Sequence, residues 1–416
     1  MKNSNLFLKK CLICNSSNLR QYLDLGVQPL ANSYVEKKNI ELEKFPLGLN
    51  LCESCWHSQL TYNVDRKYIF DNYHYASGTS NTLIKYFNWL AKSLKKTLNG
   101  NSKVLEIAAN DGSLIKKLID FKINAIGIDP AQNIVKEMNE DNVKVILGYW
   151  PESSYKLKGK FDCILCLNVL AHVDNPNPFI QGCKDKLNSR GYILIQPSQA
   201  RMIGNIEFDT CYHEHLSFFN LSSINQLATQ NDLKLYASFL VRIHGDSPIY
   251  ILGHKKYPPD VDKIINSFSS GDFFINENLS DYEKSINLYS FDTYKKFSDE
   301  SKKIIKSFEN VIKEYKMNNY KIAFVGAAAK AMTIINSTNI EPDYFYDEAK
   351  MKVNMYPPGI NIRIDPLTNC SQLNSKTLFI ITAWNFKNEL IEKIKKINPS
   401  LNSKFFTYFP KPEFHT

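Results

Sequence analysis

The sequence lacks any long apolar run. No stretch approaches the about 18 consecutive apolar residues that a membrane-spanning helix needs, and residues 1–10 show no apolar segment typical of a signal peptide. We therefore expect no membrane partner and a cytoplasmic location. Blocks of like charge are also missing, because the net charge of +9 is spread through a background rich in Lys and Asn. Charge alone gives little reason to expect nucleic acid as a partner, whereas an anionic small substrate would use the same positive field.

A GxGxxG fingerprint is absent as well, which disfavours a dinucleotide cofactor. Instead, residues 104–112 form an apolar segment typical of a strand that ends in a turn of small residues, and residues 113–119 have helical spacing. A second predicted strand, 125–129, ends in Asp129. A small-residue turn followed by a carboxylate is the logic of a Rossmann-like site. Glu106, the turn and Asp129 together favour S-adenosylmethionine (SAM), and the alternative is a doubly wound domain for another nucleotide.

The remaining pattern predicts an α/β protein with two such lobes. Further strands are expected at 161–168 and 192–196, so that the sheet is mainly parallel and binds ligands at its carboxyl edge. Residues 262–318 have helical spacing and predict one or two connecting helices. The segment 321–330 then restarts a strand–turn–helix unit, and 344–347 and 377–383 look like strands. This second Rossmann-like lobe is interpretable as a duplication that lost cofactor binding.

Four of the nine cysteines form two CxxC pairs, Cys11 with Cys14 and Cys52 with Cys55. Each pair brings two thiolates to one ion, and two pairs complete a tetrahedral site. In a cytoplasmic chain this spacing favours zinc over disulfides. Because all four ligands come from the protein, we expect the zinc to be structural. His57 is expected to be a surface bystander.

Histidine is scarce, yet two of the eight histidines fall within the tetrad Tyr212–His215. A phenol, a carboxylate and two imidazoles in four positions are suited to proton transfer near neutral pH. We predict the chemistry here, with His213 excluded as an ordinary histidine. Alternative interpretations are that Tyr212 is only a packed aromatic, or that His213 and His215 bind a metal ion.

Taken in order, the motifs resemble the sugar C-methyltransferases that act on nucleotide-linked 4-keto-deoxysugars. The resemblance covers nearly the whole chain, and eight segments carry it: Cys11 to Cys55, Tyr75 to Ser80, Leu105 to Gly112, Gly127 to Pro130, Asn168 to His172, Phe208 to Ser217, Phe324 to Lys330 and Ala383 to Phe386. It implies a zinc-binding domain at 1–72, a SAM-binding methyltransferase domain at 73–260 and a Rossmann-like nucleotide-sugar-binding domain at 261–416.

Three departures from the family pattern matter. Ala108 replaces a glycine in the cofactor turn, which costs little if φ is negative but strains the backbone if φ is positive. After His244, the residues 246–249 replace a run that usually ends in a basic group. The segment 352–354 replaces a Lys-Gln-Gly run. The first departure bears on cofactor affinity, and the other two bear on the identity of the substrate.

The resemblance implies methylation of C3 of the sugar through an enolate, with no nucleic-acid partner and a monomer or weak homo-oligomer, in deoxysugar or polysaccharide biosynthesis. The catalytic residues it implies are Tyr75, His172, Tyr212, Glu214 and His215. The cofactor-binding residues are Glu106, Ala108, Asn110, Gly112, Asp129, Pro130 and Asn168. The substrate-binding residues are His244, Lys330, Asp347 and Asn385, and the metal ligands are Cys11, Cys14, Cys52 and Cys55.

Within this interpretation, either Tyr212 or His215 is the base, and His172 holds the enolate oxygen. A tyrosine with the ordinary pKa near 10 is a poor base at pH 7, so it needs a neighbouring imidazole or cation. Two other functions stay open. One is an O-methyltransferase acting on a nucleotide sugar, and the other is a non-catalytic binding protein with a degenerate cofactor site.

Overall fold

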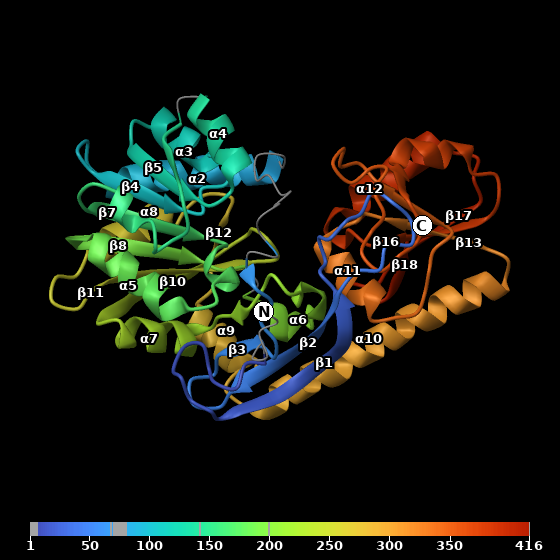
Figure 1. Cartoon of the computed structure of the whole chain (residues 1–416), viewed down its shortest axis with the longest axis horizontal. Helices are drawn as coiled ribbons and strands as arrows, with labels where there is room; N and C mark the ends of the chain where they lie inside the picture. The colour runs from blue at the N-terminus through green and yellow to red at the C-terminus, as the bar shows by residue number, and fades with distance from the viewer. Residues whose placement is uncertain (1–6, 67–68, 70–80, 141–142, 199, 416) are drawn as a thin grey trace. The chain divides into compact units, whose positions relative to one another are not determined.

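The computed structural model describes residues 7–66, 69, 81–140, 143–198 and 200–415 (Figure 1). The chain forms two compact units, and neither is one continuous segment. Unit 1 comprises residues 1–20, 50–201 and 215–289, and unit 2 comprises 21–49, 202–214 and 290–416. Within the described part of the chain, no helix is both long and apolar enough to cross a bilayer.

Unit 1 is built on an eight-stranded sheet of order β12-β10-β11-β8-β7-β4-β5-β6 (Figure 1). Its parallel part consists of β8 (Leu187–Gln196), β7 (Phe161–Leu167), β4 (Lys103–Ile107), β5 (Asn124–Asp129) and β6 (Val145–Leu147). The other three strands pair antiparallel and are β11 (Ser247–His254), β10 (Leu233–Val241) and β12 (Phe274–Ile275). The strand order reverses between β4 and β7, which places the expected ligand crevice at their carboxyl ends.

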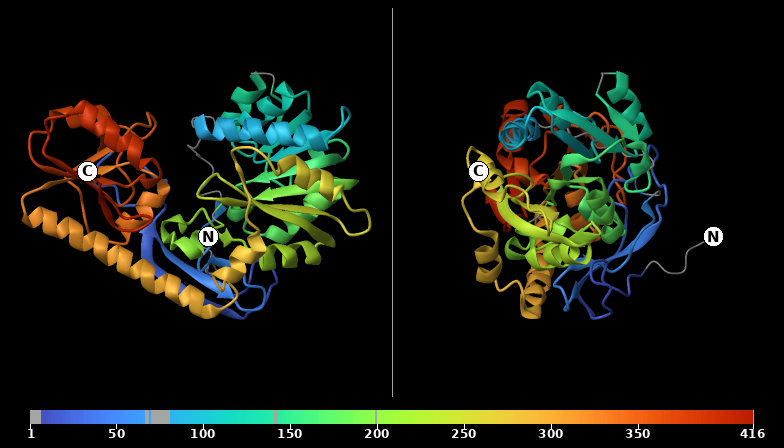
Figure 2. Two further views of the ribbon diagram at one scale, coloured as in Figure 1. Left: turned by 180° about the vertical axis from the view of Figure 1, so that it is seen from behind. Right: turned by 90° about the vertical axis from the view of Figure 1, so that its left-hand side faces the viewer.

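Helices cover both faces of this sheet, which explains why β4 is buried along nearly its whole length. One face packs against α2 (Asn81–Thr97, cyan in Figure 2), α3 (Ser113–Asp120) and α8 (Val261–Phe268). The other face packs against α5 (Pro176–Lys186) and α7 (Leu221–Gln230). The short helix α4 (Gln132–Glu140) packs beside β5 and β6. The predicted Rossmann-like methyltransferase fold is confirmed.

A separate four-stranded sheet has the order β1-β2-β3-β9. Its strands are β1 (Leu19–Pro29), β2 (Lys44–Cys52), β3 (Ser58–Leu60) and β9 (Ser217–Phe218). Cys52 ends β2, and Cys55 lies in the turn that leads to β3. This sheet therefore fixes half of the predicted metal ligands.

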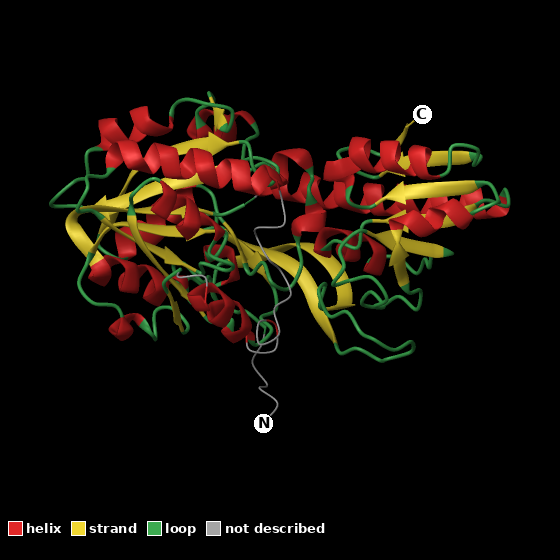
Figure 3. Cartoon of the chain, turned by 90° about the horizontal axis from the view of Figure 1, so that it is seen from above, coloured by secondary structure: helices red, strands yellow, loops and turns green. Residues whose placement is uncertain are grey.

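Unit 2 contains a six-stranded sheet of order β15-β14-β13-β16-β17-β18. Its first five strands are parallel: β15 (Ile364–Pro366), β14 (Tyr344–Asp347), β13 (Lys321–Val325), β16 (Thr377–Ile381) and β17 (Ser403–Thr407). The last strand, β18 (Glu413–His415), is antiparallel. Helices lie on both faces of the sheet (Figure 3), with α12 (Lys387–Ile397) on one and α10 (Phe291–Met317) on the other. The second Rossmann-like lobe is confirmed.

The connecting segment differs from the prediction of one or two helices. It holds three: α8, α9 (Leu279–Ser285) and α10. A polar segment with Gly271 at φ +92° ends the first, and the Asn278 side chain caps the second by accepting from two backbone N–H groups. Apolar residues continue through both breaks, which is why the apolar pattern alone does not mark them.

Candidate active site

Four cysteine sulfurs meet in unit 1. The Sγ atoms of Cys11, Cys14, Cys52 and Cys55 all lie within 4.8 Å of one another. Cys11 and Cys55 are 3.6 Å apart, and Cys14 and Cys52 are 3.5 Å apart. A tetrahedral zinc ion with Zn–S bonds of about 2.3 Å sets its sulfurs about 3.8 Å apart. The four side chains therefore fit one zinc ion without leaving a ligand position open.

His57 was wrongly predicted to lie at the surface. It is fully buried, with Nε2 3.2 Å from Ser217 Oγ and its ring against Phe219. Burial lowers the pKa of His57 to about 3. Its position between strands β2 and β3 explains the error, because the sheet pairing that encloses it has no signature in the sequence.

The predicted cofactor turn follows β4 and is held in an unusual backbone conformation. Ala108, Asn110 and Gly112 have φ values of +58°, +47° and +65°. The sequence left the sign of φ at Ala108 open, and the positive value means that its β-carbon is accommodated at a cost of about 1–2 kcal/mol. Backbone strain of this kind gathers at ligand sites. A β-carbon at Gly112 would meet Met138 Sδ at 2.9 Å at a φ of +65°, so the position favours glycine.

Asp129 at the end of β5 fixes the shape of that turn. Its Oδ2 accepts from the Asn110 N–H at 2.9 Å, and its Oδ1 accepts from the Ala131 N–H at 2.8 Å. Pro130, which lies between Asp129 and Ala131, has no backbone N–H. The carboxylate thus ties the first strand's turn to the second strand's end. Burial raises the pKa of Asp129, while the two backbone hydrogen bonds oppose that rise.

Two buried acceptors near this turn have no hydrogen-bond partner in the described part of the chain. They are Glu106 Oε2 and Asn168 Oδ1, from the β4 strand and from the residue that follows β7. Burial, and then the charges of Asp111 and Asp129, raise the pKa of Glu106 well above its usual value. Unpaired buried acceptors fit a ligand that brings hydrogen-bond donors and positive charge. SAM, with its ammonium and sulfonium groups, is such a ligand.

Two predicted catalytic imidazoles lie side by side in unit 1. His172 ends a short 3-10 turn, η3 (Leu170–His172), and His215 precedes β9, which packs against η3. The two ring centroids are 5.0 Å apart, and His215 also meets the edge of Phe218. His215 is buried and His172 is half-buried. Both belong to segments at the carboxyl edge of β7, where the fold predicts a ligand.

The rest of the tetrad belongs to unit 2. Glu214 is buried, and its Oε1 accepts from Asn32 Nδ2 at 2.9 Å. Burial raises the pKa of Glu214. Tyr212 is half-buried. His213 is buried with Nε2 3.3 Å from the Phe45 carbonyl, and burial lowers its pKa to about 4, so it is neutral at pH 7. The remaining catalytic candidate, Tyr75, lies outside the described residues.

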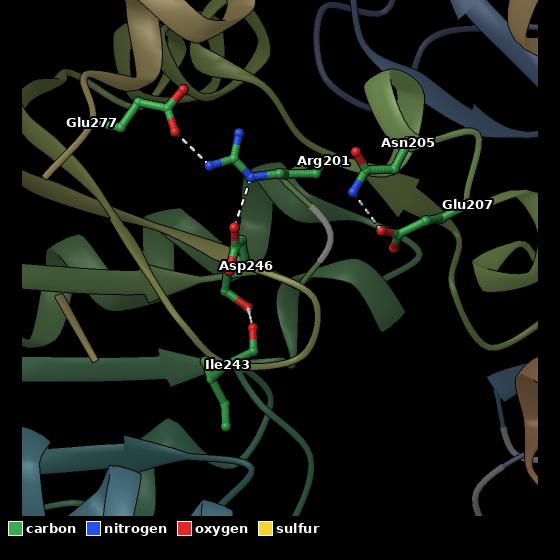
Figure 4. A network of polar contacts seen from close by, with 7 residues as sticks. Arg201, Asn205, Glu207, Ile243, Asp246 and Glu277 are labelled. Atoms are coloured by element: carbon green, nitrogen blue, oxygen red, sulfur yellow. Dashed lines mark hydrogen bonds and ion pairs between the residues drawn. The ribbon is translucent and has the colours of Figure 1, made fainter. Parts of the chain in front are cut away.

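The segment after His244 departs from the family pattern and has its own network (Figure 4). His244, Gly245 and Asp246 all have positive φ, at +53°, +79° and +65°. Arg201 Nε donates to Asp246 Oδ2 at 2.7 Å, and Arg201 Nη2 donates to Glu277 Oε2 at 2.5 Å. The guanidinium also lies 4.5 Å over the Tyr282 ring. Sequence reasoning missed Arg201, whose partners are distant in the chain.

In unit 2, Lys330 lies in the first turn of α11 (Ala329–Asn336). Its Nζ is buried, lies 5.1 Å over the Trp384 ring and has no hydrogen-bond acceptor among the described residues. The buried carboxylate of Asp209 accepts through Oδ2 from Trp384 Nε1 at 2.8 Å and from Tyr408 at 3.3 Å. Burial raises the pKa of Asp209, and the Lys330 charge opposes that rise. Asn385 is exposed beside Trp384.

Asp347 at the end of β14 ties the second lobe's turn in the same way as Asp129 ties the first. It accepts from the Ala327 N–H at 2.6 Å and from the Ala349 N–H at 2.7 Å. The Ala327 carbonyl accepts from Tyr34 Oη at 2.5 Å and from Lys352 Nζ at 2.6 Å. This turn is therefore filled by side chains of its own unit.

Comparison with known proteins matches three families along the chain. A zinc binding domain matches residues 11–70, a methyltransferase domain matches 69–238 and a C-methyltransferase C-terminal domain matches 276–410. C-methyltransferase NovU of Streptomyces niveus is 21% identical over 97% of this chain and 96% of its own length. A ubiquinone biosynthesis O-methyltransferase of Shewanella pealeana is 22% identical over 32% of this chain and 63% of that protein. A SAM-dependent methyltransferase structure from Archaeoglobus fulgidus, 14% identical, covers 38% of this chain and 73% of that one with a TM-score of 0.33.

The Rossmann-like sheet, its strained turn and the four-cysteine cluster define a SAM-dependent methyltransferase with structural zinc. The tandem order of the three domains then places the chain in the C-methyltransferases that carry a zinc-binding domain.

Proposed function

We propose that this enzyme methylates C3 of a nucleotide-linked 4-keto-deoxysugar through an enolate. The observation that carries the proposal is the pairing of His172 and His215, whose rings are 5.0 Å apart at the carboxyl edge of the methyltransferase sheet. Methyl transfer to carbon needs a carbanion equivalent, and a ketone supplies one when it loses an α proton. Two adjacent imidazoles are suited to moving that proton and balancing the charge that results.

In this mechanism the donor supplies an electrophilic methyl group on a sulfonium. The protein aligns the acceptor carbon with that methyl, and such positioning is worth about 7–11 kcal/mol. Its residues also remove the C3 proton and stabilise the negative charge on the C4 oxygen. The turn residues Glu106, Ala108, Asn110 and Gly112, with Asp129, Pro130 and Asn168, are the proposed donor-binding set.

The base is either Tyr212 or His215. Tyr212 needs a neighbouring imidazole to act at pH 7, because the ordinary pKa of tyrosine is near 10. In the other assignment, His215 takes the proton and Tyr212 donates a hydrogen bond. We propose that Glu214, held by Asn32, orients the sugar or an imidazole. Tyr75 and His172 complete the proposed catalytic set.

For the nucleotide part of the substrate we propose the second lobe, with Lys330, Asp347 and Asn385, and for the sugar His244. The Lys330 ammonium, which has no hydrogen-bond acceptor among the described residues, supports an anionic ligand. Domain bounds of 1–72, 73–260 and 261–416 accompany this assignment. The substrate's place in deoxysugar or polysaccharide biosynthesis, a cytoplasmic location and a monomeric or weakly associated state remain predictions from the sequence.

A proton-exchange assay tests the proposal. The chain is incubated in D2O, without methyl donor, with dTDP-, UDP-, GDP- and CDP-linked 4-keto-6-deoxyhexoses, and deuterium at C3 is measured by mass spectrometry. We expect exchange on at least one sugar, and we expect Tyr212→Phe or His215→Asn to slow it by about 10²–10⁴-fold, as for loss of a general base. Exchange that neither variant slows would place the base elsewhere.

The O-methyltransferase alternative is separated by the same assay, because methylation of a hydroxyl requires no exchange α to a ketone. Methyl transfer without exchange would favour it. The relatives named as O-methyltransferases match only part of this chain, whereas the C-methyltransferase matches nearly all of it. That difference supports carbon as the acceptor atom.

A further inference from the structure

A buried amide at the end of β8 has half of its hydrogen-bonding capacity unused. Gln196, the last residue of the strand, is 1% exposed, and the Tyr86 hydroxyl on α2 donates to its Oε1. Its Nε2 has no acceptor among the described residues. An unsatisfied buried donor costs about 1–3 kcal/mol, so the fold retains Nε2 for a partner that is not part of the described chain.

Tyr86 fixes which way this amide faces. The tyrosine is fully buried, and burial raises its pKa, so the hydroxyl stays protonated and donates. An amide whose oxygen accepts from that hydroxyl turns its –NH₂ group to the other side. The two N–H bonds of Gln196 are therefore preset in direction before a ligand arrives.

The amide shares its strand edge with the predicted catalytic imidazoles. Gln196 pairs with Leu167 at the end of β7, and its carbonyl accepts from the Asn168 N–H at 2.7 Å. One short turn after Asn168 comes His172, beside His215. All of these groups belong to unit 1.

The sheet order separates Gln196 from the donor-binding turn. That turn follows β4, and β8 lies two strands away across β7. Adjacent strands are about 4.8 Å apart, so the two strand ends are separated by about 10 Å. Asn168, which directly follows the intervening strand β7, presents an acceptor, whereas Gln196 presents donors. A ligand group that meets Gln196 must carry an acceptor oxygen.

We propose that Gln196 Nε2 donates to the keto oxygen of the acceptor sugar and holds the negative charge that forms there, and that Tyr86 is its positioning residue. The inference rests on the proposed function. In the step it serves, the C3–H bond breaks and the proton goes to the base. The C–H electron pair forms the C3–C4 double bond, and the C4–O π pair moves onto oxygen. Enolate C3 then takes the methyl group, the C4=O bond re-forms and the C–S pair stays on sulfur.

The carboxylate of the donor's methionyl part is the other oxygen acceptor that Gln196 could meet. The two possible contacts predict different effects of mutating Gln196. A contact with the keto oxygen affects α-proton exchange, which requires no donor. A contact with the methionyl carboxylate affects the affinity for S-adenosylhomocysteine (SAH).

The test compares Gln196→Met, which keeps length but removes the donors, with Tyr86→Phe. Tyr192→Phe is the matched control. Tyr192 lies on β8 four residues before Gln196 and is also buried, and its hydroxyl forms a hydrogen bond of 2.7 Å with the Thr97 hydroxyl on α2. C3 exchange in D2O is measured on the same four nucleotide sugars, SAH affinity by calorimetry and folding by thermal unfolding.

We expect Gln196→Met to slow exchange about 10²–10³-fold, as when one oxyanion donor is lost, with SAH affinity changed less than twofold. Tyr86→Phe should slow exchange about 3- to 10-fold, the worth of one hydrogen bond, and Tyr192→Phe should not slow it. If exchange persists in Gln196→Met, or if only SAH affinity is lost, the proposed role of Gln196 is overturned and the proposed function still stands. If the wild-type chain exchanges no sugar of the panel, the proposed function falls together with this one.

Discussion

The chain contains two versions of one strand–turn–helix unit, and they differ in what fills the turn. After β4, an Asp from the next strand accepts the N–H of Asn110, 19 positions before it. After β13, an Asp from the next strand accepts the N–H of Ala327, 20 positions before it. Both carboxylates also accept the N–H two residues beyond themselves. The backbone framework of the two turns is the same.

The side chains around the two turns are different. The first turn has three residues with positive φ and, on its strand, the buried Glu106, whose Oε2 has no hydrogen-bond partner among the described residues. The equivalent strand position in the second lobe, four residues before the bonded N–H, is the apolar Ala323. Gly326 there faces Ala383, and the Ala327 carbonyl already has two donors. The first turn keeps a buried acceptor with no partner among the described residues, whereas the second turn uses its carbonyl within its own unit. This difference fits the interpretation that the second lobe is a duplication that lost cofactor binding.

The largest expected effect comes from adding a methyl group to each turn. A β-carbon at Gly326 would lie 2.4 Å from Ala383 Cβ at a φ of +103°, so Gly326→Ala should destabilise unit 2 by about 2–4 kcal/mol without weakening SAH binding. Gly112→Ala meets the flexible Met138 and should cost about 1–2 kcal/mol but weaken SAH binding. Denaturant unfolding and calorimetry measure both. An equal loss of SAH affinity in the two variants would contradict the conclusion that only the first turn binds the methyl donor.

The next largest effect is expected from replacing Asp129 and Asp347, the carboxylates at matching positions of the two turns. Asp129→Asn removes the charged acceptor of the Asn110 and Ala131 N–H groups, and should weaken SAH binding about 10- to 100-fold. Asp347→Asn, the matched change in the second lobe, should leave SAH binding within twofold. Calorimetric titration of both variants is the measurement. If the second lobe took part in binding the methyl donor, Asp347→Asn would lower the affinity for SAH.

Of the two turns, the first is expected to make stability depend on pH through Glu106. Burial, with Asp111 and Asp129, raises the folded pKa of Glu106 above its unfolded value of about 4.3. Between those two pKa values the folded state binds one more proton than the unfolded state, so stability falls as pH rises, by at most about 1.4 kcal/mol per pH unit. Glu106→Gln should therefore gain stability relative to the wild type as pH rises above the unfolded pKa of about 4.3. A difference in stability that stays constant as pH rises from there would contradict the raised pKa of the buried Glu106.

The smallest effect is expected at Ala108. Ala108→Gly relieves about 1–2 kcal/mol of left-handed strain but adds about 0.5–1 kcal/mol of unfolded-state entropy. The net gain in stability should be below about 1.5 kcal/mol, with SAH bound equally or more tightly. Thermal unfolding with and without SAH measures it. A loss of SAH affinity would mean that the alanine methyl group contacts the donor.

The sequence predicted what depends on local pattern. Buried apolar runs located β4, β5 and β7, and doubled CxxC pairs located the four sulfurs. It did not predict features that depend on long-range pairing. The sign of φ at Ala108 depends on hydrogen bonds from β5, and His57 is buried by strand pairing.

Gln196 shows the same limit at the candidate site. In the sequence it is only the last residue of a predicted strand, with no charge, motif or spacing to distinguish it. What distinguishes it is the hydrogen bond that Tyr86, 110 positions away, donates to its side-chain oxygen. No pattern within either segment carries that information.

Hydrogen–deuterium exchange of the backbone, with and without SAH, tests the comparison of the two turns most directly. We expect SAH to protect peptides that contain residues 108–112 and 129–131. We expect no change in peptides that contain 326–330 and 347–349. Protection of the second lobe's turn, or of both turns equally, would contradict the conclusion that only the first is built to hold the methyl donor.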